Sequence, residues 1–194
     1  MTFVPPPTAE ERARRLEGVD QVERRRHELI RGELVVSPEQ SAAQREQVEL
    51  LFRIVDAFVA AGKHGKVLRD PEVKLDPYDV LVPDICYVAD DQAARERPLS
   101  DNDKPSLVVE VTAPELRRLD YVRKHAIYAT SGIPEYWYVD PGARLLIAYE
   151  LVGGRYEPIP QIEGKVASRV LPGLLIDVGG LFFGPSDHRL EPDR

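Results

Sequence analysis

The pattern of apolar and polar residues in this chain changes between a helical period and short β-type runs. Apolar residues recur every three or four positions from Val48 to Val59, and Gly62 follows them. This spacing predicts a long helix with one apolar face on the core. A second helix is predicted over residues 115–131, before Gly132. The β-type runs cover residues 28–30, 33–36, 66–68, 73–75, 80–88, 107–111, 136–139, 145–151 and 155–159. Helices and strands interspersed in this way predict an α/β fold.

Two local signals mark the ends of elements near the N-terminus. Thr8 and Glu11 are spaced as a capping box, which predicts a short charged helix that reaches about Leu16. Arg31-Gly32 separates two β-type runs. This dipeptide therefore predicts the turn of a β-hairpin.

The chain shows no internal repeat and no linker. Its 194 residues suit one sizeable domain rather than two. We expect an N-terminal arm or short helix over residues 1–19, a single domain over residues 20–185 and a polar tail over residues 186–194. The acidic and arginine-rich segment 89–104 is expected to be a solvated excursion from that domain.

Composition is that of an ordinary folded protein, with 43% hydrophobic and 30% charged residues. The single cysteine, Cys86, excludes an internal disulfide framework, and its apolar surroundings predict a buried thiol. The first residues carry prolines and acids instead of the apolar core of a secretory signal. No apolar stretch has the length needed to cross a bilayer. We therefore expect a cytoplasmic protein that makes no membrane contact.

The net charge of -7 and the pI near 5.2 limit the possible modes of nucleic-acid binding. A protein that binds nucleic acid by phosphate neutralisation alone is normally basic. Any nucleic-acid function of this chain must therefore depend on a local site that bound cations assist.

Glu110 is the one charged residue in an apolar run over residues 107–111. A run that is apolar on both faces is typical of a buried central strand. An ionised carboxylate there costs several kcal/mol unless it is paired or bound to a metal. Glu110 is therefore a candidate functional residue.

Pro83-Asp84 interrupts the second long apolar run, over residues 80–88. Proline cannot donate to a sheet ladder, so we expect the strand to be deformed beside Asp84. If this run pairs antiparallel with residues 107–111, Asp84 and Glu110 lie at the same end of the pair. Neighbouring carboxylates repel each other unless a proton or cation lies between them, and Mg²⁺ or Mn²⁺ favours such ligands. The alternative is that each acid pairs separately with an arginine.

Asp120 and Lys124 lie four residues apart and share one face of the predicted helix. An exposed ion pair is one interpretation, and it would contribute only about 0.3–0.5 kcal/mol. The helix begins directly after the Glu110 strand, however, so one of its faces overlooks the carboxylates. A lysine at this place could stabilise charge on a phosphate or orient a metal-bound water.

Pro83-Asp84 followed by Glu110-Val111-Thr112 resembles the PD-(D/E)xK signature of the restriction-endonuclease-like superfamily. The chain is more similar still to a bacterial branch of it, formerly a domain of unknown function and labelled "putative restriction endonuclease". The segments that carry this resemblance, in order over residues 20–160, are residues 28–34, 82–84, 108–114, 120–124 and 128–141. The resemblance implies a restriction-endonuclease-like core, in which helices flank a mixed, strongly bent sheet.

The resemblance also implies roles for the residues of the signature. Asp84 and Glu110 correspond to the acids that bind Mg²⁺ (or Mn²⁺), and the Val111 carbonyl or Thr112 could be a further ligand. The superfamily has a lysine where this chain has Thr112. The bacterial branch resembles a variant in which the lysine lies on the following helix, which corresponds to Lys124.

Four further positions take their expected roles from the same resemblance. Asp120 would orient Lys124. Gln44 aligns with a histidine that the branch commonly carries near the start of its first long helix. Glu28 and Glu33 match acidic positions of the branch, as a third ligand or as surface residues of the hairpin.

The preferred function is that of a Mg²⁺-dependent endonuclease that hydrolyses phosphodiester bonds in nucleic acid, most simply DNA. Thr112, Gln44 and the acidic charge instead favour a catalytically weak or inactive nucleic-acid-binding or assembly module. Hydrolysis of a small phosphoester is a third hypothesis, which the acidic charge does not oppose. By analogy with the superfamily, the chain is expected to form a homodimer.

Some residues have more than one expected role or none. Three arginines of the second predicted helix could contact phosphates or be solvated: Arg117, Arg118 and Arg123. The aromatic cluster Tyr136-Trp137-Tyr138 could serve an interface or the core. The histidines lack ligand spacing and are expected at the surface. These histidines are His27, His64, His125 and His188.

Overall fold

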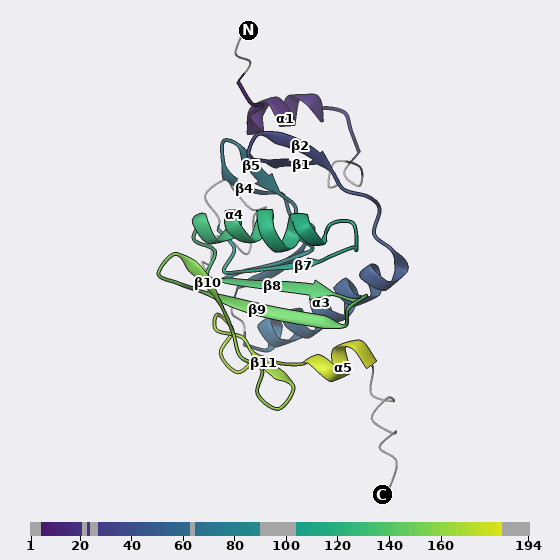
Figure 1. The fold of residues 1–194 in the computed structure, drawn as a ribbon, viewed down its shortest axis with the longest axis vertical. Helices are drawn as coiled ribbons and strands as arrows, with labels where there is room; N and C mark the ends of the chain where they lie inside the picture. Colours follow the sequence, from purple (N-terminus) through teal and green to yellow (C-terminus); the bar gives the residue numbers. More distant parts are fainter. Residues whose placement is uncertain (1–4, 21–22, 24–26, 63–64, 90–103, 184–194) are drawn as a thin grey trace, which may run out of the picture.

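A six-stranded mixed sheet forms the centre of the fold in the computed structural model, which describes residues 5–20, 23, 27–62, 65–89 and 104–183. Its strand order is β10-β9-β8-β7-β6-β3, and only the β7–β8 pair is parallel. Figure 1 shows β7, β8 and β9 side by side. The strands are β3 (Lys66–Arg69), β6 (Ile85–Val88), β7 (Leu107–Val111), β8 (Glu135–Asp140), β9 (Leu145–Val152) and β10 (Arg155–Pro158). Every residue of β6, β7 and β8 is buried, as expected for central strands.

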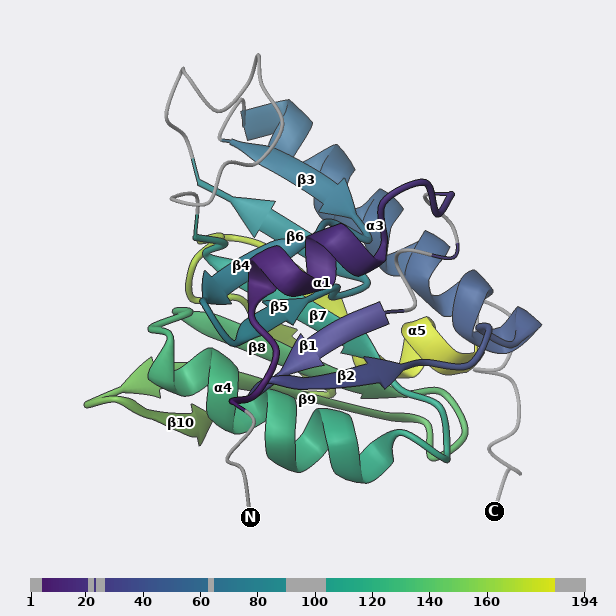
Figure 2. The same cartoon turned by 90° about the horizontal axis from the view of Figure 1, so that it is seen from above.

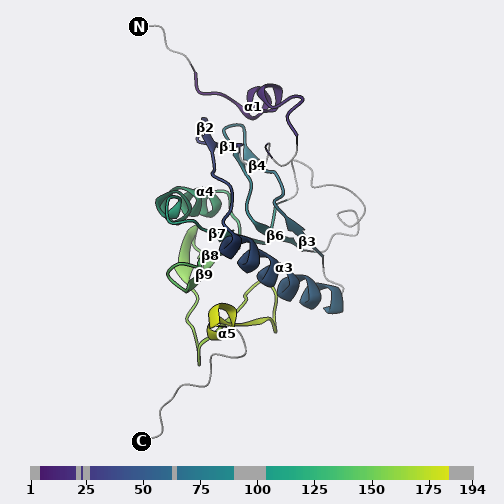
Figure 3. The ribbon, with the colours of Figure 1, turned by 90° about the vertical axis from the view of Figure 1, so that its right-hand side faces the viewer.

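Helices cover the two faces of this sheet (Figure 3). The long helix α3 (Ala42–Gly62) packs its apolar stripe on one face, and α4 (His125–Thr130) lies on the other. Side chains of β7 alternate between the faces, so Val109 joins the α3 core and Val108 joins the α4 core. The same alternation directs Glu110 towards the α4 face. The expected mixed sheet flanked by helices is thus confirmed.

A second, four-stranded antiparallel sheet lies beside the first, with strand order β2-β1-β5-β4. Its strands are β1 (His27–Ile30), β2 (Glu33–Val36), β4 (Val73–Asp76) and β5 (Asp79–Leu81). The predicted hairpin is confirmed: β1 and β2 are joined by Arg31 and Gly32, which both have positive φ angles. The short helix α1 (Ala9–Arg15) lies over this sheet, with its predicted capping box present (Figure 2).

The chain crosses from the second sheet to the first at Val82-Pro83-Asp84. The single run predicted over residues 80–88 is therefore two strands, β5 and β6, which belong to different sheets. Proline cannot donate a hydrogen bond to a ladder, so a strand boundary at Pro83 is physically favourable. Asp84 lies at the point where the two sheets meet.

The helix predicted over residues 115–131 is present over residues 117–130, but part of its first half is wound as a π-helix. A π-helical segment, η2 (Leu119–Lys124), precedes α4, and its two buried residues are Asp120 and Lys124. Short π segments inside helices are frequent at functional sites. Lys124 contacts residues that are distant in the sequence, and hydrophobic periodicity cannot reveal such tertiary contacts.

The C-terminal part adds elements that the sequence pattern did not predict. The two-stranded pair of β11 (Lys165–Ala167) and β12 (Leu175–Asp177) is followed by α5 (Val178–Phe183). Most of the predicted polar excursion, the whole predicted tail, His64 and His188 lie outside the described residues. Within the described ranges, no helix combines the length and apolarity that crossing a membrane requires.

Candidate functional site

A strongly acidic cavity of about 440 Å³ lies where the two sheets, the start of α3 and η2 meet. Seven acidic and two basic side chains contribute to its wall: Glu23, Glu28, Glu39, Asp70, Asp84, Glu110 and Asp120, with Arg45 and Lys124. Such an excess of acids repels a phosphate group unless a cation is bound. The cavity therefore combines the expected acids with the electrostatics of a cation site.

Asp84, directly before β6, lies across from Glu110 of the neighbouring strand β7. The antiparallel register pairs Ile85 with Val109, and its continuation by one residue places Asp84 across from Glu110. The prediction that both acids lie at the same end of an antiparallel pair is confirmed. Both side chains line the cavity.

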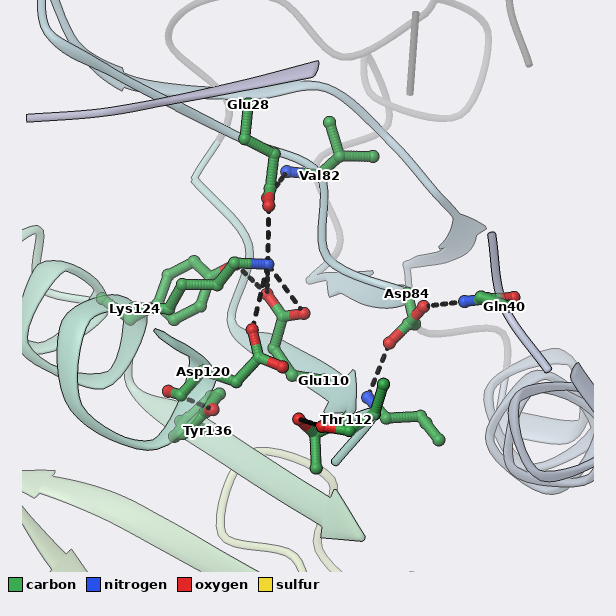
Figure 4. A network of polar contacts seen from close by, with 12 residues as sticks. Glu28, Gln40, Val82, Asp84, Glu110, Thr112, Asp120, Lys124 and Tyr136 are labelled. Carbon is green, nitrogen blue, oxygen red and sulfur yellow. Dashed lines mark hydrogen bonds and ion pairs between the residues drawn. The ribbon is translucent and has the colours of Figure 1, made fainter. Parts of the chain in front are cut away.

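The Asp84 carboxylate is held by neutral donors. Its Oδ2 accepts the Val111 N–H at 2.6 Å, and its Oδ1 accepts the Gln40 side-chain amide (Figure 4). Burial raises the pKa of Asp84 from 3.8 to about 7, against the lowering effects of the Val111 hydrogen bond and of Lys124. No ion pair of Asp84 occurs among the described residues, so the alternative of an arginine partner is wrong for this acid.

The Glu110 carboxylate, in contrast, has a cation and a phenol as partners. Lys124 Nζ lies 3.2 Å from Oε1 and 3.1 Å from Oε2, and the Tyr128 hydroxyl donates to Oε1 at 2.6 Å. Burial raises the pKa of Glu110 well above its ordinary value, and Lys124 opposes that shift. Lys124 therefore reaches the second acid from the following helix, where the lysine was expected.

Lys124 is enclosed by three carboxylates, which we call the carboxylate cage. Its Nζ lies 3.0 Å from Glu28 Oε2, 3.1 Å from Glu110 Oε2 and 3.4 Å from Asp120 Oδ1. Burial lowers the pKa of Lys124, but these three carboxylates outweigh it and raise the pKa well above its ordinary value. Lys124 is thus a permanent cation, and the idea of an exposed Asp120–Lys124 pair is wrong because both side chains are buried.

The two hairpin glutamates have different environments. Glu28 is only 2% exposed, and its Oε1 accepts the Val82 N–H at 2.8 Å while its Oε2 contacts Lys124. The hairpin-surface interpretation is therefore wrong for Glu28. Glu33 is exposed and pairs with Arg123 at 2.8 Å, and it does not line the cavity.

Gln44 and Thr112 lie beside the acids and are occupied by backbone contacts. The Gln44 side-chain amide donates to the Val111 carbonyl at 3.2 Å, and its Oε1 accepts the Ser41 N–H at 2.9 Å. The Thr112 hydroxyl donates to the Ala113 carbonyl at 3.1 Å. The Val111 carbonyl, the expected further ligand, therefore already accepts one hydrogen bond from Gln44.

The donor set fits a magnesium-type ion that keeps several waters. Asp84 and Glu110 provide hard carboxylate oxygens in a buried, acidic setting, and Mg²⁺ is commonly held by one or two carboxylates plus water and substrate. Among the described residues, no group of three or more acidic, histidine or cysteine side chains is arranged to hold a metal. The protein ligands that fit such an ion are therefore two carboxylates, with the Val111 carbonyl nearby.

Other expected candidates lie away from the cavity. Arg117 pairs with Asp140 at 2.6 Å, so it is not a free phosphate contact, whereas Arg118 is exposed. The surface expectation is wrong for His125, which packs in an aromatic cluster 4.9 Å from the Tyr149 ring centroid. Likewise His27 is mostly buried, and its Nδ1 lies 2.9 Å from a backbone carbonyl oxygen. The aromatic run at residues 136–138 lies in the core.

Sequence reasoning gave no role to two residues that contact the acids, Gln40 and Tyr128. The Gln40 amide comes from the loop before α3, and the Tyr128 phenol comes from α4. Tyr128 was recognisable only as an aromatic residue four positions after Lys124, on the same helical face. Gln40 carries no pattern signal at all.

Comparisons with known proteins agree with this architecture. A family model described as "Uma2: Putative restriction endonuclease" matches residues 11–179. The fold is similar to the crystal structure of a "putative nuclease belonging to DUF820" from Anabaena variabilis, with a TM-score of 0.66 and 14% identity, over 80% of this chain and 89% of that chain. At that identity the likeness concerns the fold alone. A search of curated proteins found no match.

Proposed function

This chain belongs to the Uma2 family of putative restriction endonucleases, and from that premise we propose that it is a divalent-metal-dependent nuclease that hydrolyses phosphodiester bonds in DNA. The observation that carries this proposal is the pair of buried acids at one end of the β6–β7 pair, with Asp84 directly before β6 and Glu110 in β7. They lie in the wall of an acidic cavity, beside a buried lysine.

A divalent cation would be held by Asp84 and Glu110, with the Val111 carbonyl as a possible third oxygen. Such an ion lowers the pKa of a bound water and polarises a phosphate. Val111 also orients Asp84, because its N–H holds Oδ2 and leaves Oδ1 to the Gln40 amide.

Lys124 would act as a fixed positive charge rather than as a base. The carboxylate cage raises its pKa, so it keeps its proton over the working pH range of nucleases. An ammonium beside the scissile phosphate stabilises the negative charge that develops there. Asp120 and Glu28 hold that ammonium in place, and Tyr128 holds the Glu110 carboxylate.

The test is metal-dependent nicking of a supercoiled plasmid. We expect cleavage with Mg²⁺ or Mn²⁺, none with a chelator, and loss of activity in Asp84→Asn and Glu110→Gln. Since loss of groups that only support a metal ligand costs about 10–100-fold, loss of a ligand should cost at least that much. Glu33→Gln is the matched control, because Glu33 is an exposed acid away from the cavity. Cleavage that survives both substitutions would refute the assignment.

A DNA-binding module without catalysis is the second candidate. It is favoured by the carboxylate cage, since three buried acids already neutralise Lys124 and leave it no free contact to a phosphate among the described residues. DNA retention by a pure protein that never cleaves any strand in Mg²⁺ or Mn²⁺ would support this candidate. Hydrolysis of a small phosphodiester by a protein that does not bind DNA would instead identify a phosphoesterase.

A further inference from the structure

Lys124 lies at the centre of a group of buried carboxylates. Three carboxylates from separate elements converge on one nitrogen: Glu28 from β1, Glu110 from β7 and Asp120 from η2, at 3.0, 3.1 and 3.4 Å. Each of these side chains is no more than 5% exposed. Buried carboxylates this close to one another require a cation among them. In this chain the protein supplies that cation itself.

Asp84 adds a fourth buried carboxylate that the ammonium does not contact. Its oxygens accept hydrogen bonds from Val111 and Gln40, which are neutral donors. The four acids together therefore keep an excess of negative charge after Lys124 is included. One divalent cation at Asp84 and Glu110 offsets most of this excess, and the number of ions is then decided by the space that the ammonium leaves at Glu110.

The position of the ammonium limits the number of ions. In two-metal hydrolases the ions lie about 3.5–4 Å apart, close enough for one carboxylate to contact both. Glu110 is the carboxylate in that position: it faces Asp84 across the strand pair, and its Oε2 lies 3.1 Å from Lys124 Nζ (Figure 4). The ammonium thus occupies the side of Glu110 at which a second ion would bind.

We infer that Lys124 is a built-in replacement for the second metal ion, and that the site takes one divalent cation per chain. This inference rests on the proposed metal site at Asp84 and Glu110. It assigns to Glu28 a positioning role, because this residue brings the second sheet into contact with the ammonium and with the Val82 N–H.

The first test is the stoichiometry of Mn²⁺ binding to the wild-type protein, measured by calorimetry and by electron paramagnetic resonance. We expect one ion per chain, with the hyperfine-split spectrum of an isolated ion. Two ions per chain, or the broadened spectrum of an exchange-coupled pair, would overturn the inference and leave the proposed function intact. No bound ion would overturn both.

The second test removes the ammonium. In Lys124→Met the cage loses its cation, so we expect this variant to bind a second equivalent of Mn²⁺ and to gain more thermal stability from Mn²⁺ than the wild type. Lys104→Met is the matched control, because Lys104 is an exposed lysine that contacts only the Ser131 carbonyl, at 3.1 Å, among the described residues. A Lys124 variant that binds one ion with a wild-type thermal response would overturn the inference. If it does not fold, the wild-type stoichiometry decides alone.

Discussion

At the scale of single residues, the site consists of buried acids whose charges are balanced in different ways. Glu110 has the Lys124 ammonium and the Tyr128 phenol, whereas Asp84 has the neutral donors Val111 and Gln40. Burial nevertheless raises the pKa of both acids, so the ionisation of each one depends on the groups beside it. These environments give two predictions about substitutions at single side chains.

The first prediction concerns the pH dependence of stability. Burial raises the pKa of Asp84 from 3.8 to about 7, so between these values the folded, metal-free protein holds a proton that the unfolded chain releases. The free energy of unfolding should therefore fall as pH rises through this window, by up to about 1.4 kcal/mol per pH unit from this group. Asp84→Asn should remove that contribution, as urea unfolding at several pH values would show. Parallel pH profiles for the wild type and the variant would contradict this account.

The second prediction concerns the Tyr128 hydroxyl. Tyr128→Phe removes the donor that fixes Glu110 Oε1, so Mn²⁺ affinity should fall by about 10–100-fold. Tyr156→Phe is a matched control, because it removes a hydroxyl of the same aromatic region that donates to the Ile133 carbonyl. In a Glu110→Gln background, Tyr128→Phe should have no further effect on Mn²⁺ affinity. An equal effect in both backgrounds would mean that the hydroxyl is merely structural.

The main site residues could be predicted from sequence because they break a local rule. Glu110 is a charge inside a fully apolar run, and Pro83-Asp84 interrupts another, so both were recognisable without a structure. Glu28 and Glu33 could not be told apart, because both are glutamates of one hairpin. Glu28 is buried against Lys124 and the Val82 N–H, whereas Glu33 is exposed and pairs with Arg123.

At the scale of elements, the site depends on how the chain passes between its two sheets. The crossing at residues 82–84 positions Asp84, and the hairpin β1–β2 supplies Glu28. The existence of most strands was predictable from their apolar runs. Their division between two sheets was not, because sheet partners are set by contacts between distant residues. The π-helical turn of η2 was hidden for the same reason.

The turn of the β1–β2 hairpin gives a prediction at this scale. Gly32 has a φ of +74°, and a Cβ there would lie 2.5 Å from Pro6 Cβ. Gly154, in the β9–β10 turn, has a similar φ of +82° but nothing within 4 Å. Both alanine variants should lose about 1–2 kcal/mol from the left-handed backbone, and Gly32→Ala about 1–3 kcal/mol more from overpacking.

Urea unfolding measures that difference directly. A lower midpoint for Gly32→Ala than for Gly154→Ala, at equal slope, would confirm that the N-terminal segment packs on the hairpin turn. Equal losses in the two variants would contradict this packing.

At the scale of the whole molecule, charge separates this protein from nucleic-acid binders that act through a basic surface. The net charge is -7, and the cavity wall carries seven acids against two bases. DNA should therefore bind weakly to the metal-free protein and more tightly once a divalent cation is bound. Fluorescence anisotropy of the wild type with a labelled duplex whose backbone is a non-cleavable phosphate analogue would measure this. Tight DNA binding in a chelator would contradict it.

The account as a whole depends on a divalent cation at Asp84 and Glu110, and calorimetric titration with Mn²⁺ tests that claim most directly. The samples are the wild type, the double variant Asp84→Asn with Glu110→Gln, and Glu33→Gln as a control for an exposed acid. We predict binding in the wild type and the control, and none in the double variant. Equal binding in all three proteins, or binding in none, would contradict the metal site and with it the proposed nuclease mechanism.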